Sequence, residues 1–233
     1  MVGRGESLTA AAVRTTPFRD RAEAGEALAR RLAELPLAPP VVVLALPRGG
    51  VPIGVVIARR LGAPLDLLMV RKIGAPWQPE LAVAAVVDAG DGEPVLVVDE
   101  DLAARTGADG AYIERCKAEQ WLEIGRRRAL YLRGRPPQPL AGKTAIVVDD
   151  GLATGTTARA ALQAVRRRGA AHVVLAVPVA PAESVERLRP SVDRMVVLAE
   201  PPEFRAIGDH YLDFHQIGDD EVVDALRGAD ATR

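Results

Sequence analysis

The sequence predicts an α/β fold with a mostly parallel central sheet and helices on both faces. Short, uninterrupted apolar runs at residues 41–46, 145–148 and 173–179 are typical of strands that are buried on both faces. These runs alternate along the chain with stretches of helical apolar spacing, an order that is typical of parallel sheets. Aromatic residues make up only 3% of a chain that is 48% hydrophobic, which predicts a core of Val, Leu, Ile and Ala.

Six elements are expected in the first 100 residues. They are a helix, a strand, a helix and three strands, at residues 19–35, 41–46, 53–61, 65–70, 81–87 and 94–98. The first helix carries Ala24, Leu28 and Leu32 at helical spacing and ends before Pro36. Glycines at both ends of residues 90–92 predict a hairpin turn between the last two strands, so we expect that pair to be antiparallel.

The second half of the chain returns to alternating helices and strands. The expected elements are helices and strands at residues 109–132, 145–148, 157–168, 172–179, 184–188 and 195–199, then a closing helix from residue 219. The first of these helices has Ile113, Cys116, Trp121 and Ile124 on one side. The three arginines at residues 126–128 are interpreted as a solvated helix face.

Charge and composition exclude several classes of protein. The formal net charge of -1 gives no general argument for nucleic-acid binding, so we expect no nucleic-acid partner. No apolar run approaches the roughly 20 residues that span a bilayer, and no secretory leader is evident. We therefore expect no membrane association and a cytoplasmic location. Cys116 is the single cysteine, which rules out an intramolecular disulfide.

The most informative segment is residues 145–157, an apolar run followed by two carboxylates and a loop of small and hydroxyl residues. Asp149 and Asp150 follow the strand at its carboxyl end, where open α/β sheets bind ligands. The loop then leads into a helix, so free backbone N–H groups and threonine hydroxyls suit a phosphate monoester. Carboxylates beside it suit vicinal sugar hydroxyls, and together they predict a sugar phosphate ligand. The alternative is an ordinary strand–loop–helix that binds no phosphate.

Two further groups of residues suit an anionic ligand. Arg48, Gly49 and Gly50 follow Pro47 between a strand and a helix, where glycines allow close approach of an anion and arginine adds a fork for phosphate oxygens. The pair Arg71 and Lys72 is expected immediately after strand 65–70, again at a carboxyl end. A plain turn with solvated cations is the alternative interpretation at both places.

Residues 145–157 resemble the ribose-5-phosphate signature of the type I phosphoribosyltransferases, which bind phosphoribosyl pyrophosphate (PRPP). The resemblance covers roughly residues 40–217. It implies one phosphoribosyltransferase-like domain over residues 1–233, with a core at about 40–199, an antiparallel insertion at 81–98 and a small C-terminal hood at about 200–217. It also implies that residues 47–50 form the pyrophosphate loop, with a cis peptide near Arg48–Gly49.

The resemblance assigns roles to the residues of these segments. It implies that Asp149, Asp150 and Lys72 are catalytic and that Mg²⁺ is the cofactor, held mostly through substrate and water near Asp149 and Asp150. The residues that it implies for PRPP binding are Arg48, Gly49, Gly50, Arg71, Lys72, Asp149, Asp150, Gly151, Leu152, Ala153, Thr154, Gly155, Thr156 and Thr157.

The implied activity is transfer of ribose-5-phosphate from PRPP to a nitrogen nucleophile, a nucleobase or another small molecule, with release of pyrophosphate. The alternative from another class is a non-catalytic regulator that senses PRPP or a nucleotide. The resemblance also allows a homodimer.

The segment of residues 204–214 resembles the base-binding segment of hypoxanthine–guanine phosphoribosyltransferases. The match implies that Phe204 stacks on the acceptor and that Asp213 lies near it. A small satellite core of aromatic residues is the alternative. Ala153 and Pro178 replace an acid and a lysine of those enzymes, which argues against a 6-oxopurine acceptor.

Overall fold

A computed structural model describes residues 16–88, 90 and 92–230. Its main sheet has five strands in the order β2-β1-β6-β7-β8, and every neighbouring pair is parallel. The strands are β1 (Val41–Ala45), β2 (Leu65–Leu67), β6 (Thr144–Val148), β7 (His172–Val179) and β8 (Arg194–Ala199). The predicted α/β fold with a mostly parallel central sheet is therefore confirmed.

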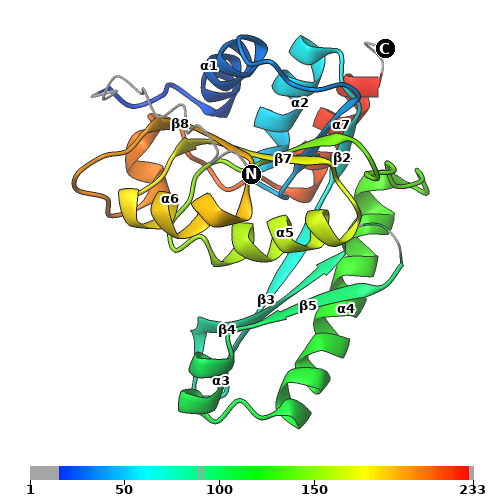
Figure 1. Ribbon diagram of the computed structural model, residues 1–233, viewed down its shortest axis with the longest axis vertical. Coiled ribbons are helices and arrows are strands. Elements are labelled where there is room, and N and C mark those ends of the chain that lie inside the picture. The colour runs from blue at the N-terminus through cyan, green and yellow to red at the C-terminus, as the bar shows by residue number, and fades with distance from the viewer. Residues whose placement is uncertain (1–15, 89, 91, 231–233) are drawn as a thin grey trace, which may run out of the picture.

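Helices cover both faces of this sheet (Figure 1). One face carries α1 (Arg21–Ala33) and α2 (Gly50–Leu61), and the other carries α5 (Thr156–Arg167) and α6 (Ala182–Leu188). The core divides accordingly, because Val43 and Ala45 of β1 pack in one apolar cluster while Val42 and Leu44 pack in the other. This division is the physical basis of the uninterrupted apolar runs in the sequence.

A second sheet of three antiparallel strands extends away from the first (Figure 1). It consists of β3 (Met69–Ala75), β4 (Gln78–Asp88) and β5 (Pro94–Val98), and it is followed by α3 (Glu100–Thr106) and the long α4 (Gly110–Leu132). We call these elements together the arm. The expected antiparallel pair is β4–β5, whose partners include Val86 and Leu96.

The arm corrects two expectations about the strands and helices. The expected strand 65–70 is split between the two sheets, because the Leu68 N–H makes the last contact with β1, a 3.0 Å bond to the Ala45 carbonyl, before the chain changes sheet. Helix α3 was not expected. It has clear capping signals, since the Asp99 side chain accepts from the Leu102 N–H at 3.1 Å and Gly107 ends the helix with a φ of 71°.

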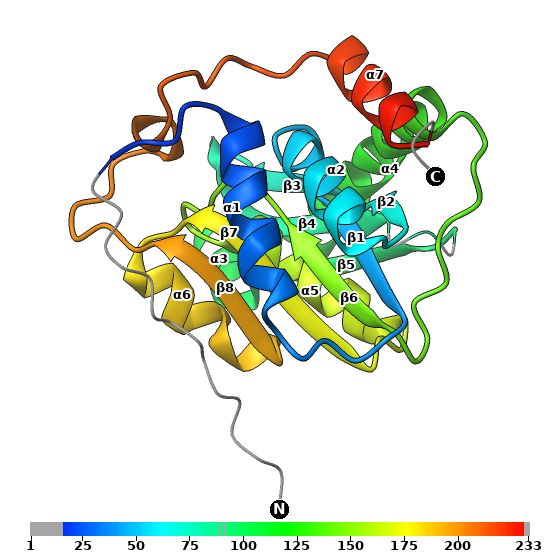
Figure 2. The same cartoon turned by 90° about the horizontal axis from the view of Figure 1, so that it is seen from above.

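The C-terminal part of the chain returns to the α1 and α2 side of the sheet. The hood, residues 200–217, contains the short 3-10 helix η2 (Ile207–His210) and pairs Tyr211 with Phe18 in an isolated bridge. It leads into α7 (Asp219–Asp230), which packs against α2 and α4, as seen from above in Figure 2. The remaining 3-10 helix, η1 (Arg189–Ser191), follows α6.

Candidate active site

The two predicted carboxylates lie together at the carboxyl end of β6. Each has one oxygen engaged within the protein. Asp149 Oδ1 accepts the Asp150 backbone N–H at 2.9 Å, and Asp150 Oδ2 accepts from Arg21 Nε at 2.9 Å. Within the described residues no hydrogen bond reaches Asp149 Oδ2 or Asp150 Oδ1. The pair therefore offers two carboxylate oxygens to a ligand.

Burial and neighbouring charges shift the pKa values of both carboxylates. Burial raises the pKa of Asp149 well above its usual value, the neighbouring Asp150 raises it further, and Arg21 and Lys72 oppose the shift. Burial also raises the pKa of Asp150, and the contact with Arg21 opposes that shift. Arg21 therefore favours the ionised forms of both acids and Lys72 favours that of Asp149, whereas burial favours the neutral forms and dominates both shifts.

The loop after Asp150 contains backbone N–H groups without an acceptor among the described residues. Leu152 donates its N–H to the Val179 carbonyl at 2.9 Å, but no hydrogen bond from the N–H groups of residues 153–157 is found in the described part of the chain. The loop is held from outside, since Ser184 Oγ donates to the Ala153 carbonyl at 2.5 Å and Arg187 donates to the Thr154 carbonyl at 3.1 Å.

A small cavity opens beside this loop. Its volume is about 220 Å³, and it is lined by Asp99, Thr154, Gly155, Thr156, Arg159 and Arg187. Arg159 lies 3.6 Å from the Asp99 carboxylate, and the remaining charge of Arg187, the open N–H groups and the threonine hydroxyls favour an anion of phosphate size here.

The glycine loop at residues 47–50 lies directly against the Asp150 carboxylate and the backbone at the end of β6. A Cβ added to Gly49 would lie 2.0 Å from Asp150 Oδ2, and one added to Gly50 would lie 2.6 Å from the Val148 carbonyl oxygen. Only glycine fits at these two positions, so the loop and the end of β6 form one surface.

The cis peptide of this loop joins Pro47 to Arg48, one bond earlier than the expected Arg48–Gly49. Gly49, the next residue, has helical dihedral angles (φ -60°, ψ -34°) as the N-cap of α2.

The predicted basic residues do not all act on the two carboxylates. The charge of Lys72 lowers the pKa of Asp149, whereas the Arg71 side chain donates to the Gln120 side chain of α4 at 2.9 Å. Both lie inside β3, which corrects the expectation that they follow a strand. Arg48 contacts Asp219 of α7, with 3.5 Å between guanidinium and carboxylate.

The arginine run at residues 126–128 is not simply a solvated face. Arg126 and Arg127 pair with Glu123 on the same helix, but Arg128 donates to the buried Asp88 of β4 at 3.2 Å. That contact joins α4 to the sheet of the arm, so the expectation of a solvated run is wrong for Arg128.

The hood holds the two predicted acceptor residues in separate contacts. Phe204 is half-buried and stacks on His210, with ring centroids 5.7 Å apart. Asp213 is exposed and pairs with His215 Nδ1 at 2.9 Å. The aromatic rings of Phe18, Tyr211 and Phe214 do pack together, but they join the large apolar core on the α1 and α2 side and leave Phe204 outside.

Sequence reasoning missed three residues of the site. Arg21 reaches Asp150 from α1, and the Tyr211 hydroxyl donates to the Asp150 carbonyl at 2.7 Å. Ile207 lies over Gly151, where an added Cβ would come within 2.6 Å of Ile207 Cγ2. Ile207 and Tyr211 fall within the segment 204–214 that the sequence singles out, but their contacts with residues 150 and 151 join positions far apart in sequence, and no local pattern marks Arg21.

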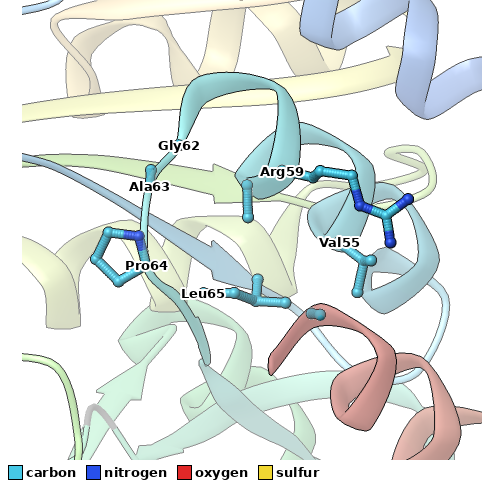
Figure 3. Close-up of a pocket in the computed structure, with 8 residues that line it drawn as sticks. Val55, Arg59, Gly62, Ala63, Pro64 and Leu65 are labelled. Atoms are coloured by element: carbon cyan, nitrogen blue, oxygen red, sulfur yellow. The ribbon is translucent and has the colours of Figure 1, made fainter. Parts of the chain in front are cut away.

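A larger cavity of about 440 Å³ lies elsewhere (Figure 3). It is formed by the C-terminal half of α2, the segment that leads into β2, and Ala229 of α7. It therefore lies near the amino end of β2 and contains none of the predicted site residues. Six of its residues, labelled in Figure 3, are Val55, Arg59, Gly62, Ala63, Pro64 and Leu65.

A parallel sheet whose carboxyl edge joins paired carboxylates, a loop with open amides and a glycine loop defines an α/β protein of the type I phosphoribosyltransferase fold. The family described as the phosphoribosyl transferase domain matches residues 20–206. The chain belongs to this family, which confirms the resemblance seen at residues 145–157.

Several known proteins are similar to the chain. Two proteins of Mycobacterium tuberculosis, from strains H37Rv and CDC 1551, are each 48% identical over 206 residues, and the first carries the name "Putative phosphoribosyl transferase Rv0571c". The match covers 88% of this chain but 45% of each relative, so the chain spans about half of their length. The crystal structure of TT1426 from Thermus thermophilus is 45% identical with a TM-score of 0.77, covering 91% of this chain and 98% of that one.

Among the helices of the described residues, none has the length and apolar character needed to cross a membrane.

Proposed function

We propose that the protein transfers ribose-5-phosphate from PRPP to a nitrogen nucleophile and releases pyrophosphate. One observation carries the proposal. Asp149 and Asp150 each keep one carboxylate oxygen without a partner among the described residues, next to a loop with open N–H groups at residues 153–157. Two acceptors beside an anion site match two vicinal hydroxyls beside a 5-phosphate.

The same geometry supports a path for the reaction. The bond between ribose C1 and the pyrophosphate oxygen breaks, and pyrophosphate leaves with the bonding electrons. The bond from C1 to the nitrogen nucleophile then forms, and the proton of that nitrogen leaves to water or to the released pyrophosphate. Positive charge develops on the ribose between these events, and the carboxylates of Asp149 and Asp150 favour that charge electrostatically while they hold the hydroxyls.

The residues near the glycine loop would bind the leaving group. Glycines at positions 49 and 50 allow close approach of the pyrophosphate, and Lys72 contributes positive charge that acts on Asp149. Arg48 and Arg71 would have to turn from Asp219 and Gln120 to reach pyrophosphate. The Arg48 contact is long and partly exposed, so its loss costs about 1 kcal/mol or less.

Mg²⁺ is compatible with this site as a companion of the substrate. No group of three or more His, Cys, Asp or Glu side chains that could hold a metal occurs in the described residues. The ion would be held mainly by oxygens of PRPP and water, near Asp149 and Asp150. When bound, it supplies charge that offsets the negative charge of pyrophosphate.

For the acceptor we propose a planar nucleobase, which would place the protein in nucleotide metabolism. The hood supplies Phe204, whose ring is covered on one side by His210 and lies outside the aromatic cluster of Tyr211. Its other side would stack on the base, and Asp213 would lie nearby.

The test has a binding arm and a turnover arm. Calorimetry with PRPP and Mg²⁺ measures binding, and release of pyrophosphate is followed with a panel of purines, pyrimidines and small amines. Release that requires one acceptor supports the transferase. Tight binding without release from any acceptor would favour a regulator that senses PRPP, and absence of binding would refute both.

A further inference from the structure

We propose that Arg21 is a positioning residue that fixes the Asp150 carboxylate so that one oxygen faces the ribose. This inference rests on the proposed function, since it assigns Asp150 to a ribose hydroxyl. Arg21 does not touch the ligand in this arrangement, and its positioning role is exerted through its hydrogen bond to Asp150.

The contact between the two residues is buried. Arg21 Nε lies 2.9 Å from Asp150 Oδ2, and the two side chains are only 8% and 12% exposed. A charged hydrogen bond in such surroundings is both stronger and more directional than one at the surface. The surface pair of Arg31 and Glu34 on the same helix, with side chains 33% and 61% exposed, provides a contrast.

The guanidinium of Arg21 is itself held by the hood. Its NH1 group donates to the His215 carbonyl at 3.0 Å, and its carbon lies 4.0 Å from the centre of the Phe214 ring. Tyr211 binds the backbone of the same aspartate through its hydroxyl. These contacts fix the direction from which Arg21 approaches Asp150.

The glycine loop closes the other side of the carboxylate. Asp150 Oδ2 lies between Arg21 and Gly49, where an added Cβ would come within 2.0 Å of this oxygen. With Oδ2 held on both sides, Oδ1 is the oxygen left for a ligand. Two directed donors on Arg21 are needed for this arrangement, and lysine, which has a point charge on a flexible stem, reproduces it only in part.

The test measures how the protein distinguishes ribose 5-phosphate from its 2-deoxy and 3-deoxy analogues. Calorimetry is performed on the full chain and on Arg21→Lys, Arg21→Gln and the control Arg31→Gln, each after its melting temperature is recorded. The unchanged protein and the control should lose about tenfold or more in affinity for each analogue, because each lacks a hydroxyl that binds a carboxylate.

In Arg21→Gln, discrimination against one of the two analogues should fall to about twofold, with Arg21→Lys between the two. Reduced stability alone does not change the ratio of the affinities for ribose 5-phosphate and for its deoxy analogue. If Arg21→Gln fails to fold, Arg21→Lys still provides a test, because it keeps the charge. Equal discrimination in the unchanged protein and in folded Arg21→Lys would overturn the role of Arg21 and leave the proposed function intact. If the unchanged protein neither binds ribose 5-phosphate nor distinguishes the analogues, the proposed function and this inference both fail.

Discussion

Replacing Gly49 with alanine tests how firmly the Asp150 carboxylate is held. The backbone of Gly49 has a φ of -60°, which alanine adopts without strain, so the backbone alone predicts no loss of stability. The new Cβ, however, would lie 2.0 Å from Asp150 Oδ2 and 2.5 Å from Asp150 Cγ. The carboxylate would have to retreat by well over an ångström to reach an ordinary contact.

The carboxylate has little room to retreat, because Arg21 holds the same oxygen at 2.9 Å in a buried pair. Overpacking of this kind costs about 1–3 kcal/mol, which corresponds to a decrease in Tm of roughly 2–12 °C for a chain of this size. Affinity for PRPP should fall as well, since Asp150 would turn away from the ligand.

The assay is a thermal melt followed by circular dichroism, together with calorimetry of PRPP binding. Gly125→Ala is the matched control. Gly125 lies within α4 with open space around its Cα, so alanine there should raise stability by about 1 kcal/mol. If Gly49→Ala has the same melting temperature as the unchanged protein and binds PRPP equally well, the carboxylate is free to move and the reasoning is refuted.

Three further variants test neighbouring contacts. Ser184→Ala should lower stability by about 0.5–1.5 kcal/mol and weaken phosphate binding, because it removes the donor to the Ala153 carbonyl; unchanged melting and calorimetry would contradict this. Phe204→Ala should raise the acceptor KM about fivefold or more with an unchanged Tm, whereas a lower Tm with unchanged kinetics would make Phe204 a packing residue. Hydrogen bonds to Asp213 and Glu221 raise the pKa of His215, so its stabilising effect is complete below the ordinary histidine pKa and is lost as pH rises through the raised value. Melting curves across that range should show a pH-dependent decrease that is absent in His215→Gln; equal pH profiles would refute it.

Most of the fold follows from local patterns. Residues 172–179 form β7 with the expected limits, because an apolar run buried on both faces has no other stable place. The failures occur where tertiary contacts decide. The run 65–70 is interrupted by Asp66, which is buried and accepts from both Leu67 and Gln138, and the chain changes sheet two residues later. One polar residue does not mark that change, because its bond to Gln138 depends on where the segment before β6 lies.

The site shows the same contrast. The carboxylates, the open loop and the glycines were predicted because their order along the chain is itself the motif. Arg21 could not be predicted, since it stands in α1 as one arginine among several, and what distinguishes it is a partner 129 residues away. Arg48 was predicted as a phosphate ligand, but its contact with Asp219 depends on where α7 returns to the sheet.

The contacts of Arg21 have a consequence for the order of folding. Its two hydrogen-bond partners are separated from it by 129 and 194 residues, so both contacts close very long loops. Such contacts form late, after the local helices and the sheet have lowered the entropic cost of bringing the segments together. A nascent chain that has emerged only as far as the loop after β6 contains both Arg21 and Asp150 but lacks the hood that orients the guanidinium. The binding site therefore matures only after residues 200–217 have been made, later than the strands that carry it.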